Sequence, residues 1–426
     1  MLDLKRVREE TALVKERLAG RGDERLLELV DRVVELDEER RSRIAEVDAL
    51  RARRNEESPR VAELKRAGRN EEAERLIREM REVAEQIAVE DARLGEIEEA
   101  LQSLLLQIPN LPEPEVPSGG EEANQVMREW GETRSFDFEP KPHWELGEEL
   151  GILDLPRGAK VAGSGFPVLV GAGARLERAL INFMLDLHTR EHGYTEVQPP
   201  FLVNATSAMG TGQLPKFGED MYQIPEDGLY LAPTAEVPLT NLHGDELLAP
   251  DALPIHYVAY SPCFRREAGA HGKDTRGLIR VHQFDKVELV RFERPENGRE
   301  ALETLTGHAE EVLKRLGLRY RVLLLAAGDL GFGNAITYDL EVWAPGVERW
   351  LEVSSCSLMT DFQARRASIR FRPEPGAKPE FVHTLNGSGL ALPRIVVALL
   401  ENGQQPDGSV VLPEALVPYF GSDRIA

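Results

Sequence analysis

The chain has 426 residues, of which 42% are hydrophobic and 30% charged, a composition typical of a folded soluble protein with two or three domains. Its two cysteines, Cys263 and Cys356, are far apart and form no CxxC pair, which argues against a disulfide framework or a structural zinc site. The charged start M-L-D-L-K-R-V-R-E-E does not resemble a signal peptide, and no apolar run approaches membrane-spanning length. We therefore expect a cytoplasmic protein that contacts no membrane.

The formal net charge of -22 at pH 7 would repel nucleic acid, but this charge is unevenly distributed. Residues 40–81 contain thirteen Arg and Lys against nine Asp and Glu, so this segment carries an excess of four positive charges. Such a segment is either a solvated helix face laced with ion pairs or a surface that binds a polyanion, and charge alone leaves both possibilities open.

Two runs of apolar residues at alternating spacings of three and four predict a pair of long helices. The first run is Leu26, Leu29, Val33, Leu36, Arg40, Arg43, Val47 and Leu50, with two arginines in the seam. The second is Ala73, Leu76, Met80, Val83, Ile87, Glu90, Leu94, Ile97, Leu101, Leu104 and Ile108, with one glutamate in the seam. We expect an antiparallel coiled-coil hairpin.

Residues 55–70 separate the two runs and contain the helix breakers Pro59 and Gly68. They predict a hairpin tip that carries the basic residues Arg60, Lys65, Arg66 and Arg69. Two interpretations stay open on the pattern alone, a coiled coil that joins two subunits and an arm whose basic tip grips an extended polyanion.

The segment L-P-E-P-E-V-P-S-G-G predicts a domain boundary near residues 109–120. After it, β-rich runs such as Y-V-A-Y, H-Q-F-D-K-V-E-L-V, Y-R-V-L-L-L-A, Y-D-L-E-V-W and W-L-E-V-S-S occur with two amphipathic helices, Gly173–Glu191 and Arg299–Leu316. This pattern predicts an α+β domain with a mixed, mainly antiparallel sheet and flanking helices.

Three local patterns suggest other chemistry. His188, Glu191 and His192 spell the inverted zinc-protease pattern H-x-x-E-H, for which a polar helix end is the simpler interpretation. Gly171 and Gly173 follow a strand-like run, but Leu176 occupies the third glycine position of a dinucleotide fingerprint. Cys263 has apolar neighbours and no indicated histidine partner, so we expect a buried strand cysteine.

The segment S-P-C-F-R-R-E-A-G carries the strongest chemical signal. It places Arg265 and Glu267 two apart at an apparent strand end, where both would face one side. Later, G-S-G-L-A-L-P-R ends in Arg394 and leads into the apolar stretch I-V-V-A-L-L. Two guanidinium groups fit a polyphosphate better than lysines would, because the guanidinium is a planar fork that stays charged. Together these residues indicate nucleotide chemistry.

The chain resembles the class II aminoacyl-tRNA synthetases in all three signature motifs, and within them the bacterial-type seryl-tRNA synthetases over essentially its whole length. The helix at Gly173–Glu191 followed by G-Y-T-E-V-Q-P-P-F-L-V is similar to motif 1, with Pro200 at the dimer-interface position. C-F-R-R-E is similar to motif 2 and G-L-A-L-P-R to motif 3. Further similar segments are M-G-T-G-Q-L-P-K-F, L-A-P-T-A-E-V-P, H-Q-F-D-K-V-E and L-E-V-S-S-C-S.

This resemblance implies a tRNA-binding helical domain over residues 1–110 and a catalytic domain over residues 111–426. It implies Arg265 and Arg394 as catalytic residues, the first on the α-phosphate and the second on the γ-phosphate of ATP. The implied ATP-binding residues are Arg265, Arg266, Glu267, Arg280, Val281, Phe284, Glu352, Val353, Ser354, Ser355 and Arg394, with Phe284 stacked on adenine. Glu352 and Ser355 would hold Mg²⁺, since a hard cation prefers oxygen ligands.

The resemblance also implies the serine-binding residues Thr234, Ala235, Glu236, Arg265, Glu288, Asn386 and Ser388. The implied reaction is ATP-dependent formation of seryl-adenylate, followed by transfer of serine to its tRNA. The hairpin tip would hold that tRNA, and the protein would be a homodimer. The sequence leaves open whether the tRNA for selenocysteine is also served.

Three alternatives remain at the level of the sequence. A related protein could load an amino acid onto a carrier protein, although such proteins generally lack the long hairpin. A non-catalytic coiled-coil protein would have no reason to keep Arg265, Glu267, Glu352 and Arg394 together. The nearest alternative is a different class II synthetase, which the hairpin and the absence of a cysteine and histidine zinc set in the sequence make less suitable.

Overall fold

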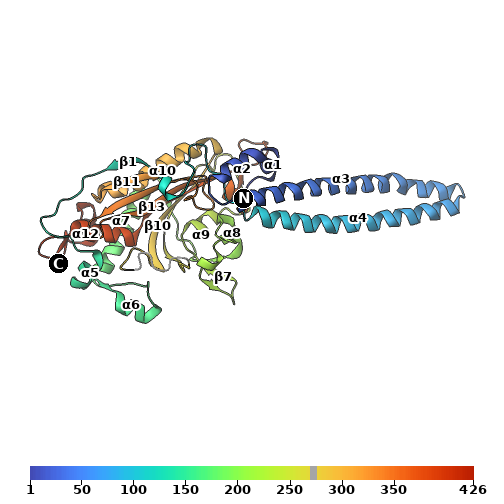
Figure 1. Ribbon diagram of the computed structural model, residues 1–426. Coiled ribbons are helices and arrows are strands. Elements are labelled where there is room, and N and C mark those ends of the chain that lie inside the picture. The colour runs from blue at the N-terminus through green and yellow to red at the C-terminus, as the bar shows by residue number, and fades with distance from the viewer. Residues whose placement is uncertain (269–275) are drawn as a thin grey trace. The chain divides into compact units, whose positions relative to one another are not determined.

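The computed structural model describes residues 1–268 and 276–426 (Figure 1). The chain divides into two compact units. The helical unit comprises Leu2–Ala19 and Asp23–Ile108, and the larger unit comprises Met1, Gly20–Gly22 and Pro109–Ala426.

The helical unit consists of α1 (Leu4–Glu9), α2 (Thr11–Ala19), α3 (Arg25–Arg66) and α4 (Asn70–Leu105). Helices α3 and α4 lie antiparallel along each other and form the hairpin that the heptad seams predict (Figure 1). Val47, Val83 and Ile87 are buried in one apolar cluster between them. Near the start of α3, Val30 is fully buried instead of the predicted Leu29, in the stretch of the unit where α2 also packs on α3.

The polar interruptions of the two seams face each other across the hairpin. Arg43 Nη1 donates to Glu90 Oε2 at 2.6 Å, and Arg40 Nε donates to Glu98 Oε1 at 3.0 Å. Arg43 Nε also donates to Glu39 Oε1 at 3.0 Å, and the hydrogen bonds to Glu90 and Glu39 raise the pKa of Arg43. A charged pair between facing heptad positions fixes which residues of the two helices lie side by side.

The predicted helix break at Pro59 is wrong, because α3 continues through Pro59 to Arg66 and the turn is confined to residues 67–69. Ser58 Oγ donates to the Arg54 carbonyl in the preceding turn, and Ala73 at the start of α4 is fully buried. Pairing with α4 therefore outweighs the helix-breaking tendency of a single proline. Gly68 does occupy the turn, with a φ of +74°.

The basic residues of the predicted tip are all exposed. Arg60, Lys65 and Arg66 lie in the last turns of α3, and Arg69 lies in the turn itself.

The larger unit is built on an eight-stranded sheet with the strand order β1-β11-β12-β13-β16-β10-β9-β4. The strands are β1 (Gln125–Trp130), β4 (Thr195–Glu196), β9 (Ile255–Phe264), β10 (Gln283–Glu293), β11 (Tyr320–Leu324), β12 (Ile336–Ala344), β13 (Arg349–Thr360) and β16 (His383–Ala391). All neighbours in this sheet pair antiparallel except β4 and β9, which pair parallel. The predicted mixed, mainly antiparallel sheet is confirmed.

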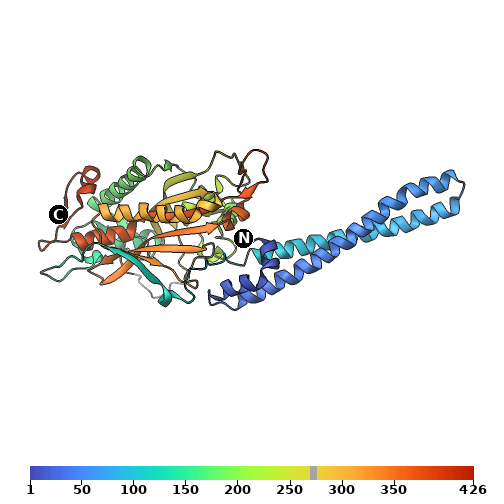
Figure 2. The ribbon, with the colours of Figure 1, turned by 90° about the horizontal axis from the view of Figure 1, so that it is seen from above.

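Three long helices pack on this sheet, α7 (Ala172–Arg190), α10 (Gly298–Arg315) and α12 (Leu392–Gly403). Figure 2 shows α10 lying along the strands. The bounds of α7 and α10 lie within one residue of the predicted helices.

Two glycines of β16 allow the helices to approach the sheet closely. A Cβ on Gly387 would lie 2.9 Å from Leu305 of α10, and one on Gly389 would lie 2.9 Å from His188 of α7. Asn386 and Ser388 alternate with these glycines and face the other side. The G-S-G segment thus presents polar side chains on one face and a flat surface for helices on the other.

Shorter elements complete the larger unit. The helices are α5 (His143–Glu149), α6 (Leu155–Ala162), α8 (Ala205–Thr211), α9 (Glu236–Asn241), α11 (Phe362–Ala367) and α13 (Val417–Phe420), and the 3₁₀ turns are Glu121–Ala123, Gly218–Asp220, Pro295–Asn297 and Glu414–Leu416. The strands are β2 (Leu153–Asp154), β3 (Val168–Leu169), β5 (Leu202–Asn204), β6 (Gln223–Ile224), β7 (Leu229–Leu231), β8 (Leu247–Leu248), β14 (Arg370–Phe371), β15 (Glu380–Phe381), β17 (Val410–Val411) and β18 (Arg424–Ile425). No helix among the described residues is both long enough and apolar enough to cross a bilayer.

Candidate active site

A cavity of about 220 Å³ in the larger unit, here called the site cavity, gathers most of the predicted site residues. Twelve of them line it: Thr234, Glu236, Arg265, Glu267, Arg280, Val281, Phe284, Glu352, Ser355, Asn386, Ser388 and Arg394. They come from strands β10, β13 and β16, from the segment after β9, and from the starts of α9 and α12. Residues spread over 160 positions of the sequence therefore meet in one small space.

Arg265 and Glu267 both line the site cavity, but not for the reason that the sequence suggested. Strand β9 ends at Phe264, and Glu267 has a φ of +52°. The segment is therefore a turn and not an extended strand. The guanidinium of Arg265 lies 5.0 Å from the centre of the Phe284 ring, and its Nε donates to the Pro233 carbonyl at 3.4 Å.

The other two arginines of the site cavity already have acidic or carbonyl partners. Arg280 Nη1 donates to Glu267 Oε2 at 2.6 Å. Arg394 Nη1 donates to the Glu352 carbonyl at 2.7 Å and to its carboxylate at 3.2 Å, and Arg394 Nε donates to the Ile279 carbonyl at 3.1 Å. Hydrogen bonds to backbone carbonyls hold the Arg394 guanidinium in place. Binding of a ligand would therefore cost little further side-chain entropy.

A bulge in β13 explains why Glu352 and Ser355, three residues apart, both line the site cavity. The pairing with β12 shifts between Ser354 and Glu352, so Val353 is an extra residue opposite a continuous β12. A bulge of this kind changes the face on which the following side chains point. The alternation of an ideal strand would have separated the two side chains.

Two buried carboxylates lie close together here, Glu236 in the lining of the site cavity and Glu288 behind Asn386. Glu288 is fully buried and Glu236 is 8% exposed. Lys286 Nζ lies 2.5 Å from Glu288 Oε2, and Asn386 Nδ2 donates to Glu288 Oε1 at 2.8 Å. Burial and the nearby charge of Glu288 raise the pKa of Glu236 to about 7. Of the two carboxylates, Glu236 lines the cavity, and a buried carboxylate suits a small cation.

Five predicted site residues do not line the site cavity. Glu288 lies behind Asn386, Ala235 and Val353 are buried, and Ser354 Oγ donates to the Ser388 carbonyl at 2.7 Å. Arg266 is exposed, and its Nη1 donates to the Glu219 carbonyl at 3.0 Å. Arg266 therefore points away from the cavity that Arg265 enters.

The sequence analysis assigned no role to Gln213 and Lys286, which also line the site cavity. Both residues belong to segments that carry the family resemblance. The sequence therefore indicated that these segments lie near the site, but it did not indicate that these two side chains line the cavity. The remaining lining residues, Leu278, Ile279, Ala391 and Pro393, are apolar and lie next to predicted residues.

The oxygen atoms near Glu352 fit a hard divalent cation. Asp339 pairs with Ser355 across β12 and β13, and its Oδ1 is buried without a hydrogen-bond partner. Burial and the charge of Glu352 raise the pKa of Asp339 well above its usual range. Within residues 1–268 and 276–426, no cluster of three or more His, Cys, Asp or Glu side chains forms a metal cage. Two protein oxygens suffice for Mg²⁺ when phosphates and water supply the others.

The three patterns that suggested other chemistry have structural explanations. His188 Nδ1 and His192 Nδ1 lie 2.9 Å apart, while Glu191 accepts from Arg315 Nη1 at 2.7 Å and is engaged in that ion pair. Cys263 is buried in β9, as expected, and burial raises the pKa of its thiol. Gly171 begins α7 in a left-handed conformation, with a φ of +55°.

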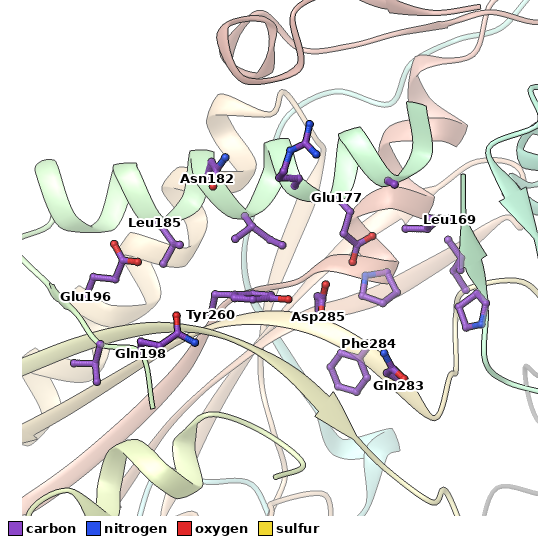
Figure 3. Close-up of a pocket in the computed structure, with 17 residues that line it drawn as sticks. Leu169, Glu177, Asn182, Leu185, Glu196, Gln198, Tyr260, Gln283, Phe284 and Asp285 are labelled. Atoms are coloured by element: carbon purple, nitrogen blue, oxygen red, sulfur yellow. The ribbon is translucent and has the colours of Figure 1, made fainter. Parts of the chain in front are cut away.

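A second cavity of about 650 Å³, here called the α7 cavity, is shared between α7, β9 and β10 (Figure 3). In Figure 3 the carboxylate of Glu177 points toward Asp285, and the Tyr260 side chain reaches toward the same group. Burial and the charge of Asp285 raise the pKa of Glu177 to about 8. Among the described residues that line this cavity only Arg178 is basic, so the cavity does not suit a polyphosphate.

The family models match both units. Residues 1–112 match the seryl-tRNA synthetase N-terminal domain, and residues 221–403 match the tRNA synthetase class II core domain (G, H, P, S and T). The chain is similar to serine–tRNA ligases of Gemmatimonas aurantiaca, at 57% identity over 100% of both chains, and of Geobacillus kaustophilus, at 58% over 99% of both.

Solved structures agree with these matches. A seryl-tRNA synthetase from Pyrococcus horikoshii, solved in complex with ATP, has 39% identity and a TM-score of 0.96 over 100% of this chain and 99% of its own. A cytoplasmic serine–tRNA ligase from Naegleria fowleri, solved with AMP, has 29% identity and a TM-score of 0.89 over 100% and 98%. These similarities extend over both units, so the chain belongs to the seryl-tRNA synthetase family.

Proposed function

We propose that the protein activates L-serine with ATP and transfers the serine to the 3′ end of tRNA(Ser), as a serine–tRNA ligase. One observation carries the proposal: a single cavity is lined by three arginines and by the buried carboxylate of Glu236, with the buried carboxylate of Glu288 behind Asn386. Arginines suit a polyphosphate, and buried carboxylates suit an ammonium group. Serine and ATP together supply these two charges.

In the first step, a carboxylate oxygen of serine attacks the α-phosphorus of ATP. The bond from that phosphorus to the bridging oxygen breaks, pyrophosphate leaves with the bond electrons, and seryl-adenylate remains. The attacking carboxylate is already ionised at pH 7, so the step needs orientation and charge stabilisation and not a general base. Arg265 would stabilise the charge that builds on the α-phosphate, and Arg280 and Arg394 would hold the β- and γ-phosphates.

The nucleoside would be held next to these arginines. Phe284 would stack on adenine, and Glu267 would accept a hydrogen bond from the adenine amino group. The oxygens of Glu352 and Ser355 would hold Mg²⁺, whose charge would neutralise part of the charge on the phosphates.

Serine would lie with its ammonium group toward Glu236 and Thr234 and its side chain toward Glu288, Asn386 and Ser388. A buried polar pocket rejects alanine or glycine, because either would leave buried groups without partners. Lack of room would exclude threonine.

The second step would transfer serine from the adenylate to the terminal ribose of the tRNA, with release of AMP. We propose residues 1–110 as the tRNA-binding domain and residues 111–426 as the catalytic domain. The exposed Arg60, Lys65, Arg66 and Arg69 would contact tRNA phosphates. Binding of RNA backbone and shape by the hairpin would leave the anticodon unread.

We further propose a homodimer joined along the motif 1 segment, α7 and residues 194–200. The α7 cavity supports this proposal, because it is larger than the site cavity and is lined by Ile181, Leu185 and Val197 from that segment. A second copy of the chain would fill it. The function also leads us to propose a cytoplasmic location.

The direct test is ATP–pyrophosphate exchange by the purified protein with each of the twenty amino acids in turn. We expect exchange that depends on serine alone, and serine-dependent charging of tRNA(Ser). Exchange with a different amino acid would contradict the proposed substrate. Exchange with serine but transfer to a carrier protein and not to tRNA would favour the carrier-loading alternative.

A further inference from the structure

A buried side chain outside the site cavity donates a hydrogen bond to one of the carboxylates that line it. Gln363 lies in α11 and is 1% exposed. Its Nε2 donates to Glu236 Oε1 at 2.7 Å and to the Thr211 carbonyl at 3.3 Å. The Glu236 carboxylate, which lines the cavity, is therefore held from outside the cavity by a neutral donor.

The orientation of the Gln363 amide follows from its three neighbours. Thr384 Oγ1 donates to Gln363 Oε1 at 2.8 Å, and Thr384 is fully buried. Turning the amide around would place its oxygen against the Glu236 carboxylate and the Thr211 carbonyl, which are both acceptors. Thr384 thus keeps the amide nitrogen directed at Glu236.

Glu236 lies among several charges. Glu288 repels its negative charge, whereas Lys286 and Arg265 favour it. The hydrogen bond from Gln363 also favours the ionised form and lowers the pKa of Glu236 against the effect of burial. Unlike lysine or arginine, a glutamine does this without adding a positive charge that would repel a bound ammonium group.

We propose that Gln363, held by Thr384, is a positioning residue for amino-acid binding, because it fixes and keeps ionised the Glu236 carboxylate that receives the serine ammonium group. The inference rests on the proposed function and extends it to residues behind the cavity. Gln363 does not touch the substrate. Its loss therefore affects the serine-binding step and leaves the nucleotide end of the cavity intact.

The test compares Gln363→Leu with the unmodified protein in serine-dependent ATP–pyrophosphate exchange. A hydrogen bond to a charged group is worth about a 10- to 100-fold change in binding, so we expect the KM for serine to rise by about that factor. The KM for ATP should change less than about twofold. The acid limb of the pH profile of kcat/KM for serine should move to higher pH, because Glu236 would protonate more easily.

Two controls separate positioning from general damage. Gln404 is another glutamine that is 1% exposed in the larger unit, where its Nε2 donates to the carbonyls of Lys141 and Glu401. Gln404→Leu should change stability but leave the KM for serine unaltered. Thr384→Val should raise the KM for serine by a smaller factor than Gln363→Leu does. Thr384→Ser, which keeps the hydroxyl, should have the KM for serine of the unmodified protein.

The outcomes are distinguishable. An unchanged KM for serine in Gln363→Leu, or equal increases in the KM for serine and for ATP, would overturn the inference. If Gln363→Leu does not fold, the difference between Thr384→Val and Thr384→Ser decides the question in the same assay. Absence of serine-dependent exchange in the unmodified protein would instead refute the proposed function.

Discussion

The hairpin of α3 and α4 and the site cavity both depend on charged side chains, but they use them in opposite ways. In the hairpin, pairs such as Arg51 with Asp91, at 2.9 Å, have both side chains more than 40% exposed. At the site cavity, the lining residue Lys286 pairs with Glu288 behind the lining, and their side chains are 7% and 0% exposed. Exposed pairs contribute little individually, whereas a buried charge that loses its partner is strongly destabilised. On the hairpin, the effect of charge thus depends on how many charged side chains are present. At the cavity, it depends on where each charged side chain lies.

The largest effect should come from replacing Arg265. This replacement tests whether a charge in the cavity has to lie at one particular place. We expect Arg265→Ala to lower kcat for ATP–pyrophosphate exchange by about 10³-fold, because Arg265 is the side chain that we propose to stabilise the charge at the α-phosphate. Arg265→Lys keeps the charge but loses the planar fork, so it should recover only part of the rate. Full activity of the lysine variant would show that charge alone is sufficient in the cavity.

The exposed charges of the hairpin should produce a smaller and graded effect. Changing Arg60, Lys65, Arg66 and Arg69 together to alanine should lower kcat/KM for tRNA charging by about 10²-fold and make it less dependent on salt. ATP–pyrophosphate exchange should be unchanged, which serves as the internal control. Single replacements should each have a small part of the effect. Normal charging by the fourfold variant would show that the hairpin does not hold the tRNA.

Acidification should weaken serine binding through Glu236, whose pKa is about 7 in the absence of substrate. The ammonium group needs the ionised carboxylate, so affinity is full above this pKa and is lost as the pH falls through it. Between pH 7.5 and pH 6 we expect the Kd for serine to rise roughly tenfold. Equilibrium binding by calorimetry would measure this change. The Kd for ATP serves as the control, since no group of ATP is proposed to bind Glu236, and a pH-independent Kd for serine would contradict the prediction.

The smallest effect should come from the seam pair of Arg43 and Glu90. Each single replacement by leucine should lower the melting temperature slightly, since Arg43→Leu leaves Glu90 without its partner on α3 and Glu90→Leu leaves Arg43 with Glu39 alone. The double replacement should lower it less than the two single effects combined, because the two apolar side chains can pack together. Circular dichroism at 222 nm would follow the melting. Strictly additive effects would mean that Arg43 and Glu90 do not act as a pair.

The regular elements were predictable because their signals are local. The heptad seams predicted α3 and α4, and the amphipathic periods predicted α7 and α10 to within one residue. Pro59 was misinterpreted because the pairing of α3 with α4, which keeps the helix intact, involves residues distant in the sequence. The same applies to Val30, whose burial coincides with the contact between α2 and α3.

The candidate site was predictable where a family motif carried the information, and unpredictable where a tertiary contact decided. Twelve motif residues line one cavity, yet Arg266 next to Arg265 points outward. Glu352 and Ser355 share the cavity only because of the bulge at Val353, which strand periodicity does not reveal. Gln363 has no local signal, because a glutamine early in a short helix is unremarkable until its partners Glu236 and Thr384 are known.

The contact between Arg280 and Glu267, at 2.6 Å, would make nucleotide binding at the proposed site an exchange of partners. The two side chains neutralise each other, so each would have to leave the other to bind a ligand. Both charges would stay paired only if a base bound Glu267 while a phosphate bound Arg280. If one of these ligand groups were missing, one charge would be left without a counter-ion. Free adenine or free pyrophosphate offers only half of this exchange. The pair would therefore favour molecules that carry both groups, before any bond is made or broken.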